Sequence, residues 1–290
     1  MPIDNRRING PENTVPYTLF TKLNTKSFKE QVQDAIPVNG KRSDGRKHLE
    51  HRKIFLKTGV VSQAKGSAYI EVGKTKVIVS CYDPREIPNK ADYCQKGELY
   101  CEFKFATFSC VQRRMFQQDA EEKQNSIILK QALEPAVCLH EFPNFQVDIY
   151  ALVLENDGSA LSASITAAGV ALAQASIPMY DLVTGLSIGI IENTFIVDPS
   201  IKEEQLCDIT DTNEGEQTAS EHGLIIMSML NTHEQISQFY QTGNIALENI
   251  SKSIDILTQV NKEIVPLVQK CLTNYVLKSV QEKEDNQAED

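Results

Sequence analysis

The stretch of residues 146–175 constrains the fold more than any other part of the chain. Residues 146–155 alternate in hydrophobicity and are rich in β-branched side chains, as expected for a strand. Asn156-Asp157-Gly158 has the composition of a turn, and Ser159 is placed to cap a helix. Residues 160–175 are small, mostly apolar and free of proline, which favours a buried helix. The sequence therefore predicts a strand that enters a buried helix through a short turn.

Such a junction raises the question of anion binding. The first turn of a helix has unpaired backbone N–H groups at the positive end of the helix dipole, and these can hold a phosphate. A phosphate held for chemistry would also need an Arg or Lys beside it. Here Gly158 lies between Asp157 and Ser159, with Glu155 before and Ala160 after, so the neighbouring charge repels an anion. We favour a closely packed turn without a ligand, and an anion site is the alternative.

Length and charge limit the classes of protein to consider. With 290 residues, of which 41% are hydrophobic, the chain can form one large domain or two small ones. Its formal net charge of −10 argues against non-specific wrapping of nucleic acid by the whole surface, although a local basic patch is compatible with it. A free-standing RNA-binding module, which is usually basic, is therefore disfavoured.

The cysteine pattern indicates an intracellular protein without a metal or cofactor. Seven cysteines without CxxC spacing predict reduced thiols and neither disulfides nor zinc. The five histidines show no metal-binding spacing, and we expect His140 and His222 to be isolated surface residues. We expect neither an export signal nor a membrane span, because no segment has the required composition. The cysteines are Cys81, Cys94, Cys101, Cys110, Cys138, Cys207 and Cys271.

Hydrophobic periodicity predicts an α+β protein with mixed sheets packed on helices. Strands are expected at residues 54–63, 67–72, 74–82, 99–110, 146–155, 179–191, 194–197 and 224–230. Helices are expected at 118–138, at 160–175 and at 245–280. The last segment should form one or two C-terminal helices, because Pro266 argues for a break.

The same patterns divide the chain into an arm, one large domain and a tail. Prolines scattered through residues 1–40 predict an extended arm. The domain covers residues 41–280, and a charged tail covers 281–290. Within the domain we distinguish a core (41–200), an exposed and mobile acidic insertion (202–222) and a C-terminal part (223–280).

Two basic segments are candidates for contacts with other molecules. Residues 41–47 form a basic cluster broken by the turn at Asp44-Gly45, which we interpret as a solvated loop or a subunit contact, with a nucleic-acid site as the less favoured alternative. Arg113 and Arg114 follow a strand and have Phe116 beside them, so they are the best candidates for binding RNA phosphates. A solvated loop or a contact with a neighbouring protein is the alternative for this pair.

Several separated motifs, in one order, carry a resemblance to the RNase PH family. They are residues 42–46, 59–71, 73–77, 133–137, 157–160 and 171–183. Within the family, Ser-Gln-Ala-Lys-Gly-Ser-Ala-Tyr at 62–69 and Met-Tyr-Asp-Leu-Val at 179–183 are most similar to the mRNA-transport type of ring subunit in the eukaryotic RNA exosome.

The resemblance implies a fold, partners and a location. The fold would be RNase PH-like, of the ribosomal S5 domain 2-like type. The chain would belong to a six-membered ring of RNase PH-like subunits around a pore, capped by S1/KH-type proteins, through which RNA passes. The expected locations are the nucleus, including the nucleolus, and the cytoplasm. The resemblance also places the loop of Arg113 and Arg114 near the pore.

Active relatives use inorganic phosphate to cleave the terminal phosphodiester of RNA, which requires cations for the phosphate and a carboxylate. The resemblance implies that both cations and the carboxylate are absent here. Ala160 stands where one arginine is expected, Glu121 lies near the second, and Gly223 stands at the carboxylate position. Asp208 and Asp211 could fold back from the insertion only as a disfavoured alternative. We therefore predict no catalytic residues and a non-catalytic ring subunit, with an active phosphate-dependent 3′–5′ exoribonuclease as the alternative.

Overall fold

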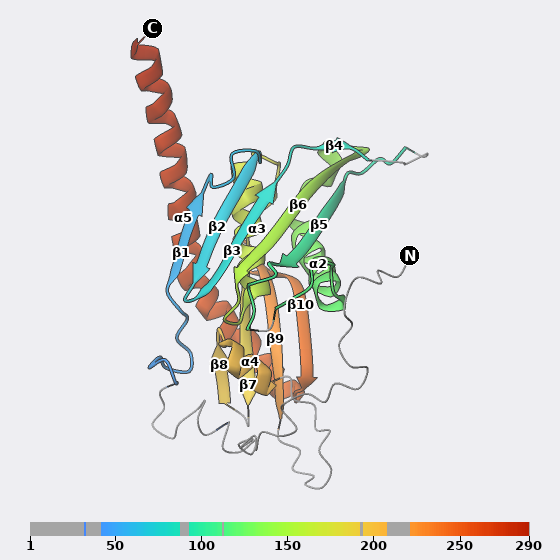
Figure 1. Cartoon of the computed structure of the whole chain (residues 1–290), viewed down its shortest axis with the longest axis vertical. Helices are drawn as coiled ribbons and strands as arrows, with labels where there is room; N and C mark the ends of the chain where they lie inside the picture. The colour runs from blue at the N-terminus through green and yellow to red at the C-terminus, as the bar shows by residue number, and fades with distance from the viewer. Residues whose placement is uncertain are drawn as a thin grey trace, which may run out of the picture.

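The computed structural model describes residues 32, 42–87, 93–111, 113–191, 194–207 and 221–289. These residues form two β-sheets with helices packed between and around them (Figure 1), which confirms the predicted α+β class with mixed sheets. The predicted arm at 1–40 lies outside the described residues, apart from Val32, which is helical and buried.

The first sheet is mixed and is built around the long strand β6. Its strands follow the order β1-β2-β3-β6-β4 with antiparallel pairing, and β5 adds to β6 as a parallel neighbour. The short strand β4 was not among the predicted strands, and the strand predicted at 99–110 ends at Phe105. The strands are β1 (Ile54–Thr58), β2 (Gly66–Val72), β3 (Thr75–Cys81), β4 (Arg85–Glu86), β5 (Glu98–Phe105) and β6 (Phe145–Glu155).

The second sheet is antiparallel, with the strand order β10-β9-β7-β8. The two central strands, β7 and β9, are buried along their whole length, as expected for strands covered on both faces. The strands predicted at 179–191 and 194–197 correspond to β7 and β8, which pair antiparallel. Strand β10 was not predicted, because its residues are polar and only partly buried. The strands are β7 (Val183–Ile191), β8 (Thr194–Val197), β9 (His222–Leu230) and β10 (Gln235–Asn244).

Helix α3 (Ala160–Gln174) lies between the two sheets and is buried from Ala160 to Leu172. It packs on β2 and β3 of the first sheet and on β7 of the second. The contact is close because small residues meet on both sides. A Cβ atom on Gly66 would lie 2.1 Å from the backbone oxygen of Ala171, and one on Gly185 would lie 2.7 Å from that of Ser162. The alanine-rich and serine-rich sequence of α3 is therefore a packing requirement.

Two further helices flank the sheets. Helix α2 (Ala120–Leu133) packs on β5 and β10, and α5 (Leu247–Glu289) packs on β7 and β1. The C-terminal end of α5 extends beyond the sheets (Figure 1). Residues 281–289 therefore continue this helix, whereas the sequence had suggested only a charged tail. None of the helices described is long and apolar enough to cross a membrane.

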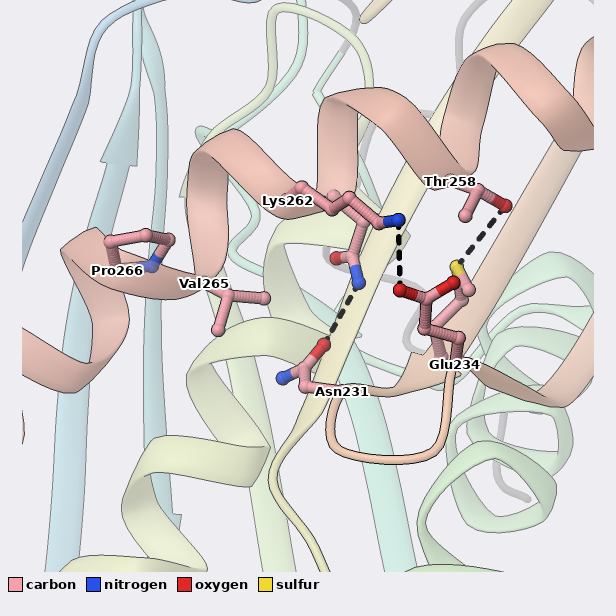
Figure 2. Close-up of a pocket in the computed structure, with 8 residues that line it drawn as sticks. Asn231, Glu234, Thr258, Lys262, Val265 and Pro266 are labelled. Atoms are coloured by element: carbon pink, nitrogen blue, oxygen red, sulfur yellow. Dashed lines mark hydrogen bonds and ion pairs between the residues drawn. The ribbon is translucent and has the colours of Figure 1, made fainter.

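The break predicted at Pro266 is wrong, because α5 continues through this residue. A proline in a helix removes one hydrogen bond, but Ile264 and Val268 on either side are buried against the core and hold the helix in place. A cavity of about 180 Å³ lies beside Pro266 (Figure 2). Near it Lys262 pairs with Glu234 at 2.8 Å, which ties α5 to the turn between β9 and β10.

The acidic insertion predicted at 202–222 is only partly supported. Residues 202–207 belong to helix α4 (Ile201–Cys207), in which Glu203, Leu206 and Cys207 are buried. His222 lies in β9 and is also buried, so the expectation of a surface histidine is wrong. Residues 208–220 lie outside the described residues.

Replacing Gly66 should show how tightly α3 is held. We expect Gly66→Ala to cost about 2–3 kcal/mol of unfolding free energy, because its methyl group would collide with the backbone of α3. Gly45→Ala is the matched control, since Gly45 has a positive φ of +85° but nothing within 4 Å, and it should cost only about 1–2 kcal/mol. Urea unfolding of both variants measures the difference. Equal costs would contradict close packing at Gly66.

Candidate functional site

The candidate site is the turn between β6 and α3, where two consecutive residues have left-handed backbone conformations. The φ angles are +88° at Gly158 and +58° at Ser159. Ser159 does not cap α3 with its side chain, contrary to the prediction. Its hydroxyl donates instead to the backbone oxygen of Pro199 at 3.1 Å and accepts a hydrogen bond from the hydroxyl of Ser187 at 2.7 Å. The turn is thus bound to β7 and to the segment that leads into α4.

Arg52 holds the other side of this turn. Its guanidinium donates to the backbone oxygens of Asp157 at 2.9 Å and Gly158 at 3.1 Å. The same group makes two hydrogen bonds of 2.7 Å to the carboxylate of Asp198. Burial alone would raise the pKa of Asp198, but the hydrogen bonds and charge of Arg52 and the charge of His51 outweigh it, so this pKa lies well below its ordinary value. Both side chains are therefore ionised and buried together.

Arg42 forms a second buried ion pair and corrects the interpretation of the basic cluster at 41–47. Its side chain is fully buried and pairs with Glu203 of α4 through two hydrogen bonds. It also donates to the backbone oxygen of Val197 at 2.7 Å. Arg42 is therefore a structural residue that fixes α4 to the end of β8, and it is unavailable to RNA.

Glu204, next to Glu203 on α4, provides the central feature of the site. Its carboxylate accepts a hydrogen bond of 2.6 Å from the backbone N–H of Ser159. This donor is one of those that an anion at the start of α3 would use. A carboxylate of the chain itself therefore stands where the sequence raised the question of a bound anion.

A cavity of about 210 Å³ opens beside this contact. It brings together Glu204, Glu121 of α2 and Ala160 of α3, three residues far apart in the sequence. The rest of its lining is apolar or uncharged, and consists of Phe105, Gln124, Asn125, Asn156, Ser159, Leu161, Leu224, Ile226, Tyr240 and Thr242. Among the described residues, two carboxylates and no cation line the cavity, so these walls do not favour an anion.

The start of β9 contributes to this cavity but has no space for a carboxylate. Leu224 lines the cavity, and Gly223 precedes it in the strand. A Cβ atom on Gly223 would lie 2.4 Å from the backbone oxygen of Thr242. The glycine is thus required by the close pairing of β9 and β10. Asp208 and Asp211, the other acids considered from the sequence, lie outside the described residues.

The structure separates the two arginines proposed to bind RNA. Arg114 is half-buried, and its guanidinium already has partners within the chain. It lies 2.9 Å from the carboxylate of Glu121 and donates a hydrogen bond to Cys110 Sγ at 3.3 Å. It also lies over the ring of Phe105, 4.2 Å from the centroid. Arg113 is exposed and has no ion-pair partner among the described residues. Both line a groove of about 680 Å³ between the loop after β5 and helix α4.

Lys202 of α4 lies on the opposite wall of this groove and was not identified from the sequence. It is exposed, and it too lacks an ion-pair partner in the part of the chain that the structure describes. Lys202 could not be identified from the sequence because it lies in an acidic segment, and only the fold brings α4 close to the loop after β5.

Models of one protein family match most of the region that forms the two sheets. The model described as "3' exoribonuclease family, domain 1" matches residues 50–178. The model described as "3' exoribonuclease family, domain 2" matches residues 181–210. The matched regions include the β6–α3 turn and α4, the two elements that form the candidate site.

Curated relatives are similar over most of their length. The exosome complex component RRP41-like of Arabidopsis thaliana is 35% identical over 231 residues, which cover 80% of this chain and 84% of the relative. The exosome complex component MTR3 of Homo sapiens is 36% identical over 220 residues, or 71% of this chain and 75% of the relative. Rrp41 of Pyrococcus furiosus is 34% identical, covering 87% of this chain and 96% of the relative.

Solved structures share the fold. Rice Rrp46 superposes with a TM-score of 0.67 and 23% identity, covering 80% of this chain and 100% of that chain. A chain of the Archaeoglobus fulgidus exosome, solved with RNA bound to its active site, superposes with a TM-score of 0.70 and 18% identity, covering 82% of this chain and 98% of that chain. The RNase PH-like fold expected from the sequence is thus confirmed.

The stability of the protein should depend on pH through Asp198. The pKa of this carboxyl is depressed in the folded state, so its stabilising contribution is present above its unfolded pKa of about 3.9 and is lost as the pH falls below that value. We expect Asp198→Asn to lower the unfolding free energy at pH 7, and the gap to the wild type to narrow below about pH 4. Urea unfolding between pH 7 and pH 3 measures this, and a gap that is independent of pH would contradict it.

The pair of Arg42 and Glu203 should behave as one unit. The variants Glu203→Leu and Arg42→Met each leave one buried charge without its partner. Each should therefore lower the unfolding free energy by about 3–5 kcal/mol. The double variant should cost much less than the sum of the two. Simple additivity in a double-mutant cycle would show that the pair is not coupled.

Proposed function

Because this chain belongs to the 3′ exoribonuclease (RNase PH) family, we propose that it is a non-catalytic subunit of an RNA exosome ring. In this role it scaffolds the ring and lines part of the RNA channel, and so supports 3′–5′ processing and degradation of RNA, including ribosomal RNA, by the assembly. The three relatives described above are each named as exosome components, which supports the assignment to this assembly.

The observation that carries the non-catalytic assignment is the hydrogen bond from the backbone of Ser159 to Glu204. Phosphorolysis requires a phosphate dianion held close to the RNA end, and the family motif that resembles residues 157–160 would hold it at this turn. A phosphate placed there would meet the carboxylates of Glu204 and Glu121 in one cavity. The negative charges of these carboxylates would repel a phosphate dianion in the same cavity, so the site disfavours phosphate binding.

The size of the effect can be judged from other enzymes. Removing a single preorganised group that stabilises charge typically costs about a hundredfold or more in rate. Here the arginine expected at Ala160 is absent, and the region of the second arginine carries Glu121. A third requirement fails at Gly223, where a carboxylate would have no space. Together these losses support a subunit that performs no chemistry of its own.

The alternative is an active phosphate-dependent 3′–5′ exoribonuclease. The similarity to Rrp41 of archaea favours it. Phe105 and Glu121 line the cavity, and among the described residues the cation in contact with both of them is Arg114. Because Glu121 already neutralises Arg114, this arginine is poorly suited to hold a phosphate.

The proposed role implies partners and a location. The partners are the other RNase PH-like subunits of the ring, S1/KH-type cap proteins, and RNA passing through the assembled complex, with no membrane involved. The proposed locations are the nucleus, including the nucleolus, and the cytoplasm. Affinity purification of the tagged chain from cells, followed by native mass spectrometry, should recover it in a large complex with RNase PH-like subunits. Recovery of the chain alone would contradict the scaffold role.

The absence of catalysis is tested with purified protein. The chain, alone and with its nearest ring partner, is incubated with end-labelled single-stranded RNA, Mg²⁺ and inorganic phosphate. We expect no phosphate-dependent shortening and no nucleoside diphosphates, because the carboxylate of Glu204 already accepts the backbone N–H of Ser159 and would repel a phosphate at this turn. Parallel reactions without phosphate detect contaminating hydrolases. Robust release of nucleoside diphosphates would overturn the proposal in favour of the alternative.

A further inference from the structure

The last turns of helix α5 carry an apolar face that the described part of the chain leaves exposed. The thiol of Cys271 donates to the backbone oxygen of Leu56 in β1 at 3.5 Å, and a Cβ atom on Gly59 would lie 3.9 Å from the ring of Tyr275. Gly59 follows the last residue of β1, so the residues after Tyr275 lie at and beyond the end of this strand. Figure 1 shows this part of α5 extending past the sheets.

Large aliphatic side chains are exposed on this projecting part of α5. The exposed fractions are 55% for Val276, 56% for Leu277 and 46% for Val280. Residues three and four apart in a helix share a face, so Val276 and Leu277 both lie beside Val280. Leu272, one turn before Val276, packs partly against the core and joins this face to the body of the protein. We call Leu272, Val276, Leu277 and Val280 the α5 ridge.

Exposed lysines lie beside the α5 ridge. Lys270 lies about two turns before Leu277, on the same side of the helix. Lys278 follows Leu277 directly, and Lys57 of β1 is next to Leu56, which contacts α5. Within the part of the chain that the structure describes, none of these three lysines has an ion-pair partner. On a chain with a net charge of −10, this surface is locally positive and attracts an acidic partner.

The combination of aliphatic side chains and lysines decides between classes of partner. Single-stranded nucleic acid would use the lysines, but its bases stack on aromatic rings and the ridge offers aliphatic side chains. A second copy of this chain, ridge against ridge, would bring the same lysines together, and like charges across an interface repel. A helix with an apolar stripe between acidic residues would match both features, because rows of side chains three and four residues apart interlock between packed helices.

We propose that the α5 ridge docks an acidic amphipathic helix of a partner protein. The apolar stripe of that helix packs on the ridge, and its carboxylates contact Lys57, Lys270 and Lys278. The inference goes beyond the proposed function, which assigns no partner to α5, and it does not depend on whether the subunit is catalytic.

The test measures peptide binding to the affinity-purified complex that contains the tagged chain, by fluorescence anisotropy. The labelled peptides are about 18 residues long, or about five helical turns, with Leu on one face and Glu on both flanks of it. Binding of the acidic peptides should weaken as salt is added, because salt screens exposed charges. Lys270→Glu combined with Lys278→Glu should weaken binding at least about tenfold and remove most of this salt dependence.

The apolar part of the surface is tested separately. Leu277→Ser combined with Val280→Ser should also weaken binding at least about tenfold, but it should leave the salt dependence unchanged. Both side chains are exposed, so the fold should tolerate these changes. The matched control is Lys123→Glu combined with Lys252→Glu, which changes the net charge equally at exposed positions on α2 and at the start of α5. This control should bind the peptides as the wild type does.

Three results of the binding assay would overturn the proposal. The first is no binding of the acidic peptides to the wild-type complex, and the second is an equal loss of binding in the control variant. The third is a preference of the ridge for single-stranded RNA, or for the same peptides with Lys in place of Glu.

Native mass spectrometry separates this inference from the proposed function. The variant of Lys270 and Lys278 should assemble normally. If it does not, the ridge is a contact between ring subunits and the docking proposal is overturned, while the scaffold role stands. Pairing of two copies of the chain that is lost in the variant of Leu277 and Val280 would also overturn it. If the wild-type chain is not recovered in a complex at all, the proposed function fails, and the same peptide assay on the purified full chain tests the ridge by itself.

Discussion

Two buried ion pairs determine the geometry of the candidate site. Arg52 with Asp198 and Arg42 with Glu203 place four charges in the interior. Removing each ion from water costs on the order of several kcal/mol of hydration free energy. Such charges are tolerated only where hydrogen bonds satisfy them, and here both guanidinium groups also bond to backbone oxygens. These bonds fix α4 against the β6–α3 turn. The position of Glu204 follows from that attachment.

The close packing of α3 explains why the turn is so strongly constrained. The helix is buried between two sheets, so neither of its ends can shift to admit a ligand without moving a sheet. Two of its buried hydroxyl groups are satisfied within the helix or by β7: Ser164 donates to the backbone oxygen of Ala160, and Thr166 accepts from the N–H of Gly185. The small hydroxyl side chains of α3 therefore allow the helix to pack closely while their polar atoms stay hydrogen-bonded, and these bonds do not indicate catalytic groups.

The sequence predicted those parts of the fold that local patterns determine, and it failed where distant segments meet. Strand β6 and helix α3 were predicted because hydrophobic period and turn composition agree over residues 145–174. Arg42 was interpreted as part of a solvated loop or a subunit contact, because its partner Glu203 lies far along the chain in a segment whose composition is simply acidic. For the same reason, no local signal could assign Glu204 to the backbone of Ser159. Pro266 led to the opposite error: its local preference predicted a break, but tertiary packing keeps the helix continuous.

Glu204 gives the turn a stability that does not depend on a ligand. Ser159 is the residue before the first residue of α3, so its N–H takes no part in the hydrogen bonds within the helix. A partly buried donor without an acceptor would cost about 1–3 kcal/mol. In a site that binds an external anion, this donor is satisfied only when the anion is bound. Here a carboxylate held by α4 satisfies it permanently, and Arg52 neutralises part of the added charge through its bonds to the same turn. The proposed scaffold role requires this turn to be ordered whether or not phosphate is present, and the internal carboxylate of Glu204 provides that order without a ligand.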